Sequence, residues 1–213
     1  MTVMLPEPAS RWALNDGDAA HTAADIIGAH TATGSNIAWC AAAVNGNCAT
    51  FGGTDSDFTT SGPVLNTAPG SSFTVSAAVD LSKAGGFQTI VSQDGTHDSG
   101  FYLQYVGATN NWAFSRVTGD TNAGPAGIRA LSTTAVPALN TWTELVGVFD
   151  ASDNQLRLYV NGVLQGTATD PSPFGTSGDL AIGRAQFDSA PTDWFDGAAN
   201  QIEVWNVALT TAQ

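Results

Sequence analysis

Positively charged side chains are scarce in this sequence. Its 213 residues include six Lys and Arg against 19 Asp and Glu, which gives a formal net charge of −13 at pH 7. Proteins that bind nucleic acid neutralise several phosphates with Lys and Arg, and anionic membranes attract clusters of the same residues. Six cations cannot form such a patch, so neither nucleic acid nor an anionic membrane surface is an expected partner.

Long apolar runs are also missing. The sequence has no stretch of about 18 apolar residues, which excludes a transmembrane helix and membrane insertion. Residues 1–6 lack a basic segment followed by an apolar run, so they do not fit a signal peptide. We interpret residues 1–9 as a short N-terminal leader and expect residues 10–213 to form one domain, taken from a larger secreted protein.

Cysteine is limited to Cys40 and Cys48, which flank the dipeptide Asn45-Gly46. Asn-Gly is a strong hairpin signal because both residues tolerate positive φ, and a hairpin here would bring the two sulfurs together. We therefore expect a local disulfide and an oxidising, extracellular setting. The alternative is that both cysteines are reduced and merely fill small apolar positions. No further cysteine is present for a zinc site.

Apolar and polar residues alternate with a period of two over much of the chain, which is typical of half-buried strands. Asn161-Gly162 is a second hairpin signal, and no helix is expected before Leu209, where the last residues look like the start of one. The sequence thus predicts an all-β fold of two antiparallel sheets packed face to face. The expected strands are residues 73–80, 87–92, 101–106, 112–117, 141–150, 155–160, 163–167, 180–183 and 198–205, with a loop at 118–126.

Several of these segments carry a family resemblance. In order, residues 73–79 (FTVSAAV), 91–95 (VSQDG), 140–150 (NTWTELVGVFD) and 155–162 (QLRLYVNG) resemble laminin-G-like (concanavalin A-like) jelly-roll domains of bacterial secreted proteins. The resemblance runs from about residue 10 to residue 213 and implies a two-sheet antiparallel jelly-roll sandwich. The last strand departs from the family pattern, because Asn200 and Gln201 stand where acidic residues are common.

Glycosidases occur on the same architecture, and they need two carboxyl groups that flank the scissile bond. The three glutamates, Glu7, Glu144 and Glu203, are far apart in the sequence, and Glu144 is expected to face solvent. His97 lies between Asp94 and Asp98, which suggests a triad, but a turn histidine with solvated acidic neighbours is the simpler interpretation. We therefore expect a domain without catalytic activity, and a glycan-active enzyme is the less favoured alternative.

The resemblance also implies a structural calcium site, because an N-terminal loop of this family can close an ion against the last strand. By this resemblance Asp25 would supply a carboxylate, Gly28 and His30 backbone carbonyls, and Asn200 a side-chain oxygen. An asparagine in place of the family's aspartate removes one negative charge and weakens the site. The alternative is a metal-free loop in which Asp25 caps a turn. A second acidic group, Asp188, Asp193 and Asp196, is expected to be solvated surface charge.

Aromatic side chains suggest a place for a ligand. Trp112 follows a turn and Trp194 lies in a polar loop, so these two and Tyr105 are the expected exposed aromatics. The remaining tryptophans of the strands are expected in the core: Trp12, Trp39, Trp142 and Trp205. The sequence predicts an extracellular recognition or adhesion module for a glycan or a protein, with carbohydrate favoured. The alternative is a spacer or protein-interaction domain without a small ligand, favoured if Trp112 and Trp194 are both buried.

Overall fold

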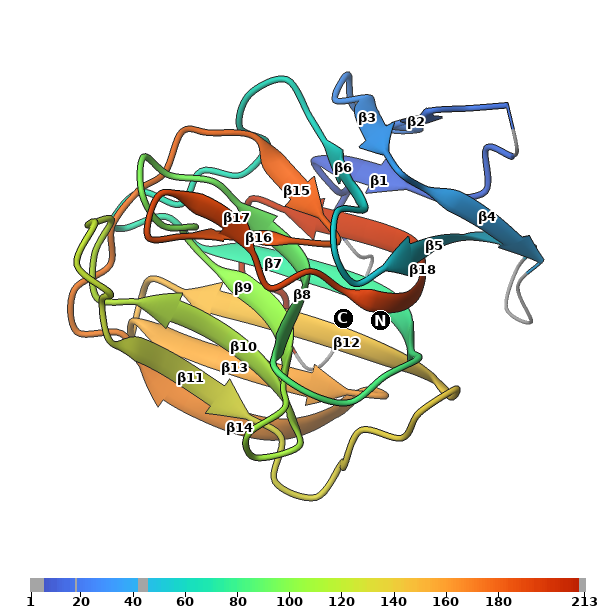
Figure 1. The fold of residues 1–213 in the computed structure, drawn as a ribbon. Helices are drawn as coiled ribbons and strands as arrows, with labels where there is room; N and C mark the ends of the chain where they lie inside the picture. Colours follow the sequence, from blue (N-terminus) through green and yellow to red (C-terminus); the bar gives the residue numbers. More distant parts are fainter. Residues whose placement is uncertain (1–5, 18, 42–45, 211–213) are drawn as a thin grey trace, which may run out of the picture.

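The computed structural model describes residues 6–17, 19–41 and 46–210, which form eighteen β-strands. Two large antiparallel sheets lie face to face, and a short hairpin of β16 (Ala185–Phe187) and β17 (Ala190–Thr192) packs beside them (Figure 1). The expected all-β, two-sheet sandwich is confirmed. Within the described residues, no helix is long and apolar enough to cross a membrane.

The first sheet, sheet A, contains both ends of the described chain. Its edge strand β1 (Ser10–Trp12) pairs with the last strand, β18, and the short N-terminal segment before β1 is tied to β18 by the bond from the Ala9 N–H to the Val204 carbonyl. The order of the other strands is β14 (Val163–Thr169), β13 (Gln155–Val160), β12 (Trp142–Asp150), β7 (Phe73–Leu81), β18 (Asp196–Trp205), β5 (Asn47–Gly52) and β4 (Ala38–Ala41).

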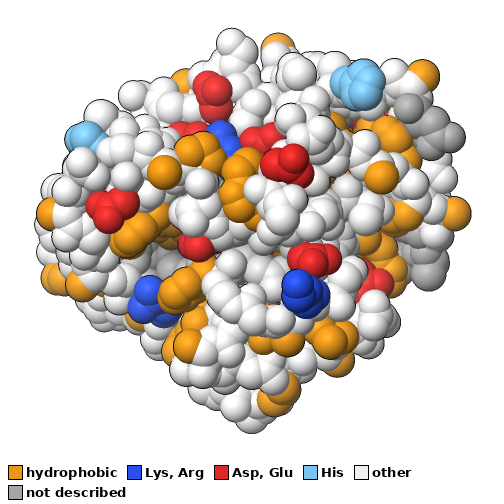
Figure 2. Space-filling model, in the orientation of Figure 1, with side chains coloured by type: hydrophobic (Ala, Val, Ile, Leu, Met, Phe, Trp, Pro, Cys, Tyr) orange, Lys and Arg blue, Asp and Glu red, His pale blue; other side chains and the backbone are white. Residues whose placement is uncertain are grey.

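The second sheet, sheet B, faces sheet A across the core. Its order is β11 (Gly127–Leu131), β10 (Asn111–Val117), β9 (Tyr102–Val106), β8 (Phe87–Gln93), β15 (Leu180–Ile182), β6 (Asp57–Thr59), β3 (Ala32–Ser35) and β2 (Thr22–Ala23). The hairpin of β16 and β17 covers part of its outer face, where Tyr102 and Val117 pack under Phe187. Figure 2 shows the side of the molecule that carries this hairpin, with basic side chains few and separate.

The core follows from the alternation of side chains along the strands. On β7 the residues at odd positions from Phe73 to Leu81 are buried, whereas Ser76, Ala78 and Asp80 are half-buried on the outer face. Phe73 packs against Phe101 and Phe149, with ring centroids 5.2 and 5.5 Å apart. This pattern is the period of two that the sequence predicts for a sheet with one buried face.

Close approach between the sheets depends on one small residue. Gly147 of β12 faces the ring of Phe114 on β10, and a Cβ atom at Gly147 would lie only 2.3 Å from that ring. Because real Cβ atoms do not approach so closely, position 147 admits no side chain unless the sheets move apart. The glycine therefore fixes how closely sheets A and B pack in this part of the core.

Several local expectations have clear outcomes. Both residues of the second hairpin signal, Asn161 and Gly162, have positive φ (49° and 75°), as a type I′ turn requires. Residues 118–126 form a loop, as expected, but β11, which begins at Gly127, was not predicted. The expected start of a helix after Leu209 is not found as far as Thr210, and residues 211–213 lie outside the described part. The predicted core position of Trp12 is confirmed, whereas Trp39 and Trp142 are only half-buried.

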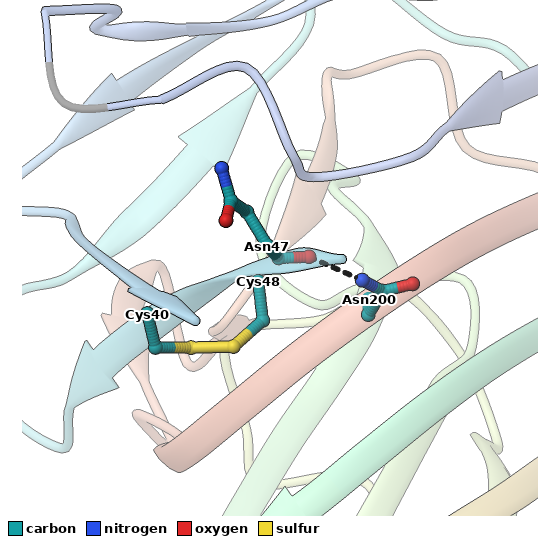
Figure 3. The surroundings of a disulfide bond; sticks show 4 residues. All are labelled: Cys40, Asn47, Cys48 and Asn200. Atoms are coloured by element: carbon teal, nitrogen blue, oxygen red, sulfur yellow. Dashed lines mark hydrogen bonds between the residues drawn. A yellow bond between two sulfur atoms is a disulfide. The ribbon is translucent and has the colours of Figure 1, made fainter. Parts of the chain in front are cut away.

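The two cysteines are bonded, as predicted. Cys40 and Cys48 face each other on the neighbouring strands β4 and β5, with their Cα atoms 5.0 Å apart (Figure 3). The turn residues 42–45, including Asn45 of the expected hairpin signal, lie outside the described residues. The disulfide closes the edge of sheet A next to the last strand.

Arg116 is a charged residue inside the sandwich. Its side chain on β10 is fully buried, and its guanidinium carbon lies 4.7 Å from the centre of the Phe149 ring. Its Nε lies 3.2 Å from a carboxylate oxygen of Asp170, which is also fully buried. Burial lowers the pKa of Arg116 to about 10, although the negative charge of Asp170 acts in the opposite direction. The two opposite charges of this ion pair offset each other within the core.

Candidate functional site

Two of the three predicted ligand-binding aromatics are buried. Trp112 and Tyr105 are each only 1% exposed, and their rings meet edge to face with centroids 6.0 Å apart. The two residues are register partners on β10 and β9, and both point between the sheets. The prediction that they are exposed is wrong, because the turn at Asn110 ends before Trp112 and the inward face of β10 begins there.

Trp194 is half-buried and remains the one partly accessible aromatic of the three. It follows β17 and forms an isolated parallel bridge with Thr89 of β8. The amide of Thr89 donates to the carbonyl of the preceding residue, Asp193, at 2.7 Å. The segment that contains Trp194 is therefore fixed against sheet B and is not a loose polar loop.

The predicted calcium ligand Asp25 is engaged in another way. Its carboxylate accepts hydrogen bonds from the backbone N–H groups of Arg11, Ile27, Gly28 and His30, at 2.9–3.1 Å. Burial alone would raise the pKa of Asp25, but these four donors outweigh it and lower the pKa to about 2. A Cβ atom at Gly28 would lie 2.6 Å from this carboxylate, so the turn requires glycine. Asp25 caps the loop, which is the alternative interpretation of the sequence.

Asn200, the fourth predicted ligand, points to a different part of the molecule. Its side chain is 1% exposed, and its Nδ2 donates to the carbonyl of Asn47 beside the disulfide (Figure 3). The strand β1 lies between the last strand and Asp25, because Trp12 pairs with Ile202 on one side and with Asp25 on the other. Asn200 therefore ties the last strand to the disulfide hairpin.

These four residues do not fit a calcium ion. Calcium requires six to eight oxygen ligands, whereas the oxygens of Asp25 already accept four N–H donors. Among the described residues, no group of three or more His, Cys, Asp or Glu is placed to hold a metal. Calcium binding by this protein stays a prediction.

The suggested triad around His97 also does not form. Its Nδ1 lies 2.7 Å from the hydroxyl of Ser189, on the turn between β16 and β17. Asp94 instead binds Arg184, and the carboxylate of Asp98 accepts the backbone N–H groups of Thr121 and Asp188. Both neighbouring aspartates thus hold loops together, and neither orients the imidazole.

A groove of about 470 Å³ lies on the outer face of sheet A, and we call it the sheet A groove. Strand pairing places five of its residues in one row across five strands: Tyr159, Val146, Ser76, Glu203 and Arg11. Because neighbouring strands are about 4.8 Å apart, the row is about 19 Å long. Such a row suits an extended ligand.

The floor of the groove is apolar and one wall comes from the C-terminal segment. Val146, Val148 and Ala78 line this floor together with Trp205, whose Nε1 donates to the carbonyl of Pro6. Leu209 forms the wall, because its N–H donates to the Thr74 hydroxyl at 3.0 Å. This bond holds the segment after β18 against sheet A.

Three polar side chains in the groove have free hydrogen-bonding groups. Within the described residues, the Tyr159 hydroxyl, the Glu144 carboxylate and the side-chain amide of Gln201 have no hydrogen-bond partner. Glu144 is exposed, as predicted. Glu203 is different, since it forms an ion pair with Arg11. An apolar floor with a few unpaired polar groups is typical of ligand sites.

Two of the three glutamates share this groove, although they are far apart in the sequence. Glu144 pairs with Ala78, and Glu203 pairs with Ser76, two residues away on the intervening strand β7. The two backbones are therefore separated by two strand spacings and a two-residue offset, about 12 Å in total. This is the separation of the backbones and not of the carboxyl groups, for which glycosidases require about 5–9.5 Å. Glu203 also forms an ion pair with Arg11.

Comparison with protein families gives one match, which covers residues 51–213 and is described as the concanavalin A-like lectin/glucanases superfamily, in its laminin G branch. The chain belongs to this superfamily. The match begins within β5, and the strands before it extend both sheets. The comparison with curated proteins gives no match.

Solved structures with the same fold share little sequence with this superfamily member. Domain 4 of an extracellular arabinanase from Geobacillus stearothermophilus, solved with arabinotriose, is 19% identical with a TM-score of 0.70, over 97% of this chain and 96% of that one. A Ruminococcus gnavus sialidase domain (CBM40) bound to sialyllactose is 16% identical with a TM-score of 0.55, over 68% and 80%. Trypanosoma rangeli sialidase with sialic acid is 14% identical with a TM-score of 0.63, over 95% of this chain but only 31% of that one.

Proposed function

We propose that this protein is a non-catalytic carbohydrate-recognition module that binds an extended oligosaccharide in the sheet A groove. The observation that carries the proposal is the row from Tyr159 to Arg11 on the outer face of sheet A. Sugar rings have apolar CH faces and many hydroxyl groups, so they need both an aromatic or apolar surface and polar side chains with free donors or acceptors.

Each part of the groove has a role in this proposal. The ring of Tyr159 and the side chain of Val146 contact the apolar face of a sugar ring. The Tyr159 hydroxyl, the Glu144 carboxylate and the Gln201 amide exchange hydrogen bonds with its hydroxyl groups, at little cost because none has a partner in the described chain. The groove lies on a rigid sheet, so little conformational entropy is lost on binding.

Two solved structures with the same fold support this proposal. Domain 4 of the arabinanase was solved with arabinotriose and the CBM40 domain with sialyllactose, and both are parts of larger carbohydrate-active enzymes. The disulfide between Cys40 and Cys48 fits an oxidising environment. We accordingly propose an extracellular module that is carried by a larger secreted protein.

Binding of neutral oligosaccharides to the purified protein tests the proposal. A glycan array identifies a ligand, and calorimetry measures its affinity for the wild type and for Tyr159→Ala and Tyr159→Phe. We expect Tyr159→Ala to weaken binding about tenfold or more and Tyr159→Phe to weaken it less, because the phenylalanine keeps the stacking surface.

Gln155→Ala is the matched control, since Gln155 lies on the same face of β13 but outside the groove. Its affinity is expected to equal that of the wild type. An array without any glycan ligand, or a ligand whose affinity does not change in Tyr159→Ala, contradicts the proposal and favours a spacer or protein-interaction domain. Hydrolysis of the bound oligosaccharide, lost in Glu144→Gln, would contradict the absence of catalysis.

A further inference from the structure

A second, smaller hollow lies on the opposite side of the molecule. It has a volume of about 120 Å³ on the outer face of sheet B, and its walls include Phe87 of β8, Arg129 of β11, and Thr192 and Asp193 beside the β17 strand. We call it the Arg129 hollow. It is much smaller than the roughly 300 Å³ of a site that encloses a whole drug-sized ligand. The Arg129 hollow therefore suits one end of a ligand.

Arg129 is an exception among the arginines of this protein. Arg11, Arg116, Arg157 and Arg184 each form an ion pair with a carboxylate. Arg129 forms neither an ion pair nor a hydrogen bond with any described residue. Its guanidinium carbon lies 5.2 Å from the centre of the Phe87 ring, which is 39% exposed. The ring holds the guanidinium group in place and leaves its N–H donors free.

Asp193 supplies the opposite charge in the same hollow. Its backbone is fixed to β8 by the bond from Thr89, and its side chain lies near Arg129 without direct ion pairing. Burial raises the pKa of Asp193, while the Thr192 hydroxyl and the charge of Arg129 partly oppose this effect. The hollow thus offers a fixed cationic donor, a carboxyl acceptor and the face of an aromatic ring.

We propose that the Arg129 hollow binds a sugar acid. A carboxylate of the ligand accepts two N–H donors of Arg129, the geometry that guanidinium and carboxylate groups share. A hydroxyl of the same sugar donates to Asp193, and the apolar face of its ring contacts Phe87. A simple anion would satisfy Arg129 alone, and a neutral sugar would leave it unpaired, so the three groups together favour a hydroxylated carboxylic acid. This site lies apart from the sheet A groove and goes beyond the function proposed above.

Two sugar acids and their neutral counterparts test the proposal. The methyl glycosides of glucuronic acid and of N-acetylneuraminic acid represent the two common sources of a sugar carboxylate, and the methyl ester of each removes the charge. Titration of the wild type, followed by calorimetry or ligand-observed NMR, is expected to show that at least one acid binds about tenfold or more tightly than its ester. The net charge of −13 repels anions in general, so this preference requires a local cation.

The variants connect this preference with the hollow. Arg129→Gln is expected to weaken binding of the acid about tenfold or more and to make acid and ester equal. Asp193→Ala should weaken both several-fold, because it removes the acceptor of the sugar hydroxyl. Arg157→Gln, at an ion-paired arginine of sheet A, is the control and should bind the acid as the wild type does.

Three outcomes would overturn the proposal: acid and ester that bind equally to the wild type, an Arg129→Gln variant that keeps the preference for the acid, or acetate that competes as well as the sugar acid. Tyr159→Ala separates this site from the sheet A groove. It should leave the sugar acid bound while it weakens a neutral oligosaccharide, so either proposal can fail while the other holds.

Discussion

Arg116 and Arg129 lie on the neighbouring strands β10 and β11, but their environments are opposite. Arg129 pairs with Ser115, so it points to the outer face, whereas Arg116, one position further along β10, points into the core. Arg116 is enclosed by three aromatic rings and neutralised by Asp170, while Arg129 contacts one ring and no carboxylate. A difference of one position along a strand separates a structural charge from one that is available to a ligand.

The largest effect on stability is expected at the buried pair. Arg116→Ala leaves the carboxylate of Asp170 buried without a counter-charge, and this should lower the free energy of unfolding by about 3–5 kcal/mol. Guanidinium chloride unfolding measures this loss. The double variant Arg116→Met, Asp170→Leu replaces both charges with apolar side chains and should recover most of the stability. A loss below about 1 kcal/mol in Arg116→Ala would contradict a structural role for this charge.

The disulfide is expected to contribute less. Cys40 and Cys48 are eight residues apart, so the bond closes a short loop, and its removal in a Cys40→Ser, Cys48→Ser variant should cost about 2–3 kcal/mol by the chain-entropy model. Denaturant unfolding with and without a reducing agent provides the measurement. The reduced wild type should match the double variant; a wild type that reductant leaves unchanged, although its thiols become free, would show that the bond does not stabilise the fold.

The sequence predicts the scaffold well because alternation is a local signal. Most strands from Phe73 to Trp205 and the disulfide pairing follow from periodicity and turn residues within a few positions, whereas β11, β16 and β17 were not predicted. The prediction that Trp112 and Tyr105 are exposed was wrong, because a nearby turn does not show on which face of the sheet a strand residue lies. In their case one register pair places both rings in the core.

The candidate sites could not be predicted in the same way. The sheet A groove is made of residues from five strands, and only the order of the strands in the sheet brings Tyr159 and Arg11 to one row. The Arg129 hollow depends on β11, which sequence periodicity missed, and on the fact that Arg129 forms no ion pair with any described carboxylate. Neither the order of distant strands nor the absence of a partner is visible in a linear pattern.

Asp25 provides an intermediate case, a carboxylate neutralised by N–H dipoles. Asp25→Asn should lower the free energy of unfolding by about 2 kcal/mol at pH 7, because four backbone donors lose a charged acceptor. Since the folded pKa of about 2 lies below the unfolded value of 3.8, this stabilisation is present above about pH 4 and is lost as the pH falls toward 2. Unfolding curves of both proteins from pH 7 to pH 2 should therefore converge at low pH.

The same assay decides the calcium prediction. Since the oxygens of Asp25 are occupied by N–H donors, addition of calcium or of a chelator should leave the melting temperature of the wild type unchanged. An ion present at about a thousand times its dissociation constant would instead stabilise the fold by about 4 kcal/mol. A difference in stability between wild type and Asp25→Asn that persists at pH 2, or a large calcium effect, would show that Asp25 has a role other than capping the loop.

Of the substitutions considered, the one at Arg129 is expected to lower the stability least, in contrast to the one at Arg116. Arg129→Gln removes one cation–π contact with Phe87 at an exposed position, which is worth at most about 0.5–1 kcal/mol. In the same denaturant titration, the losses of unfolding free energy in Arg116→Ala and Arg129→Gln should thus differ by several kcal/mol, although the two arginines lie on neighbouring strands. If Arg129→Gln destabilised the fold as strongly as Arg116→Ala, its loss of ligand binding would reflect unfolding. A stable Arg129→Gln protein that no longer distinguishes a sugar acid from its ester would instead assign this arginine to recognition.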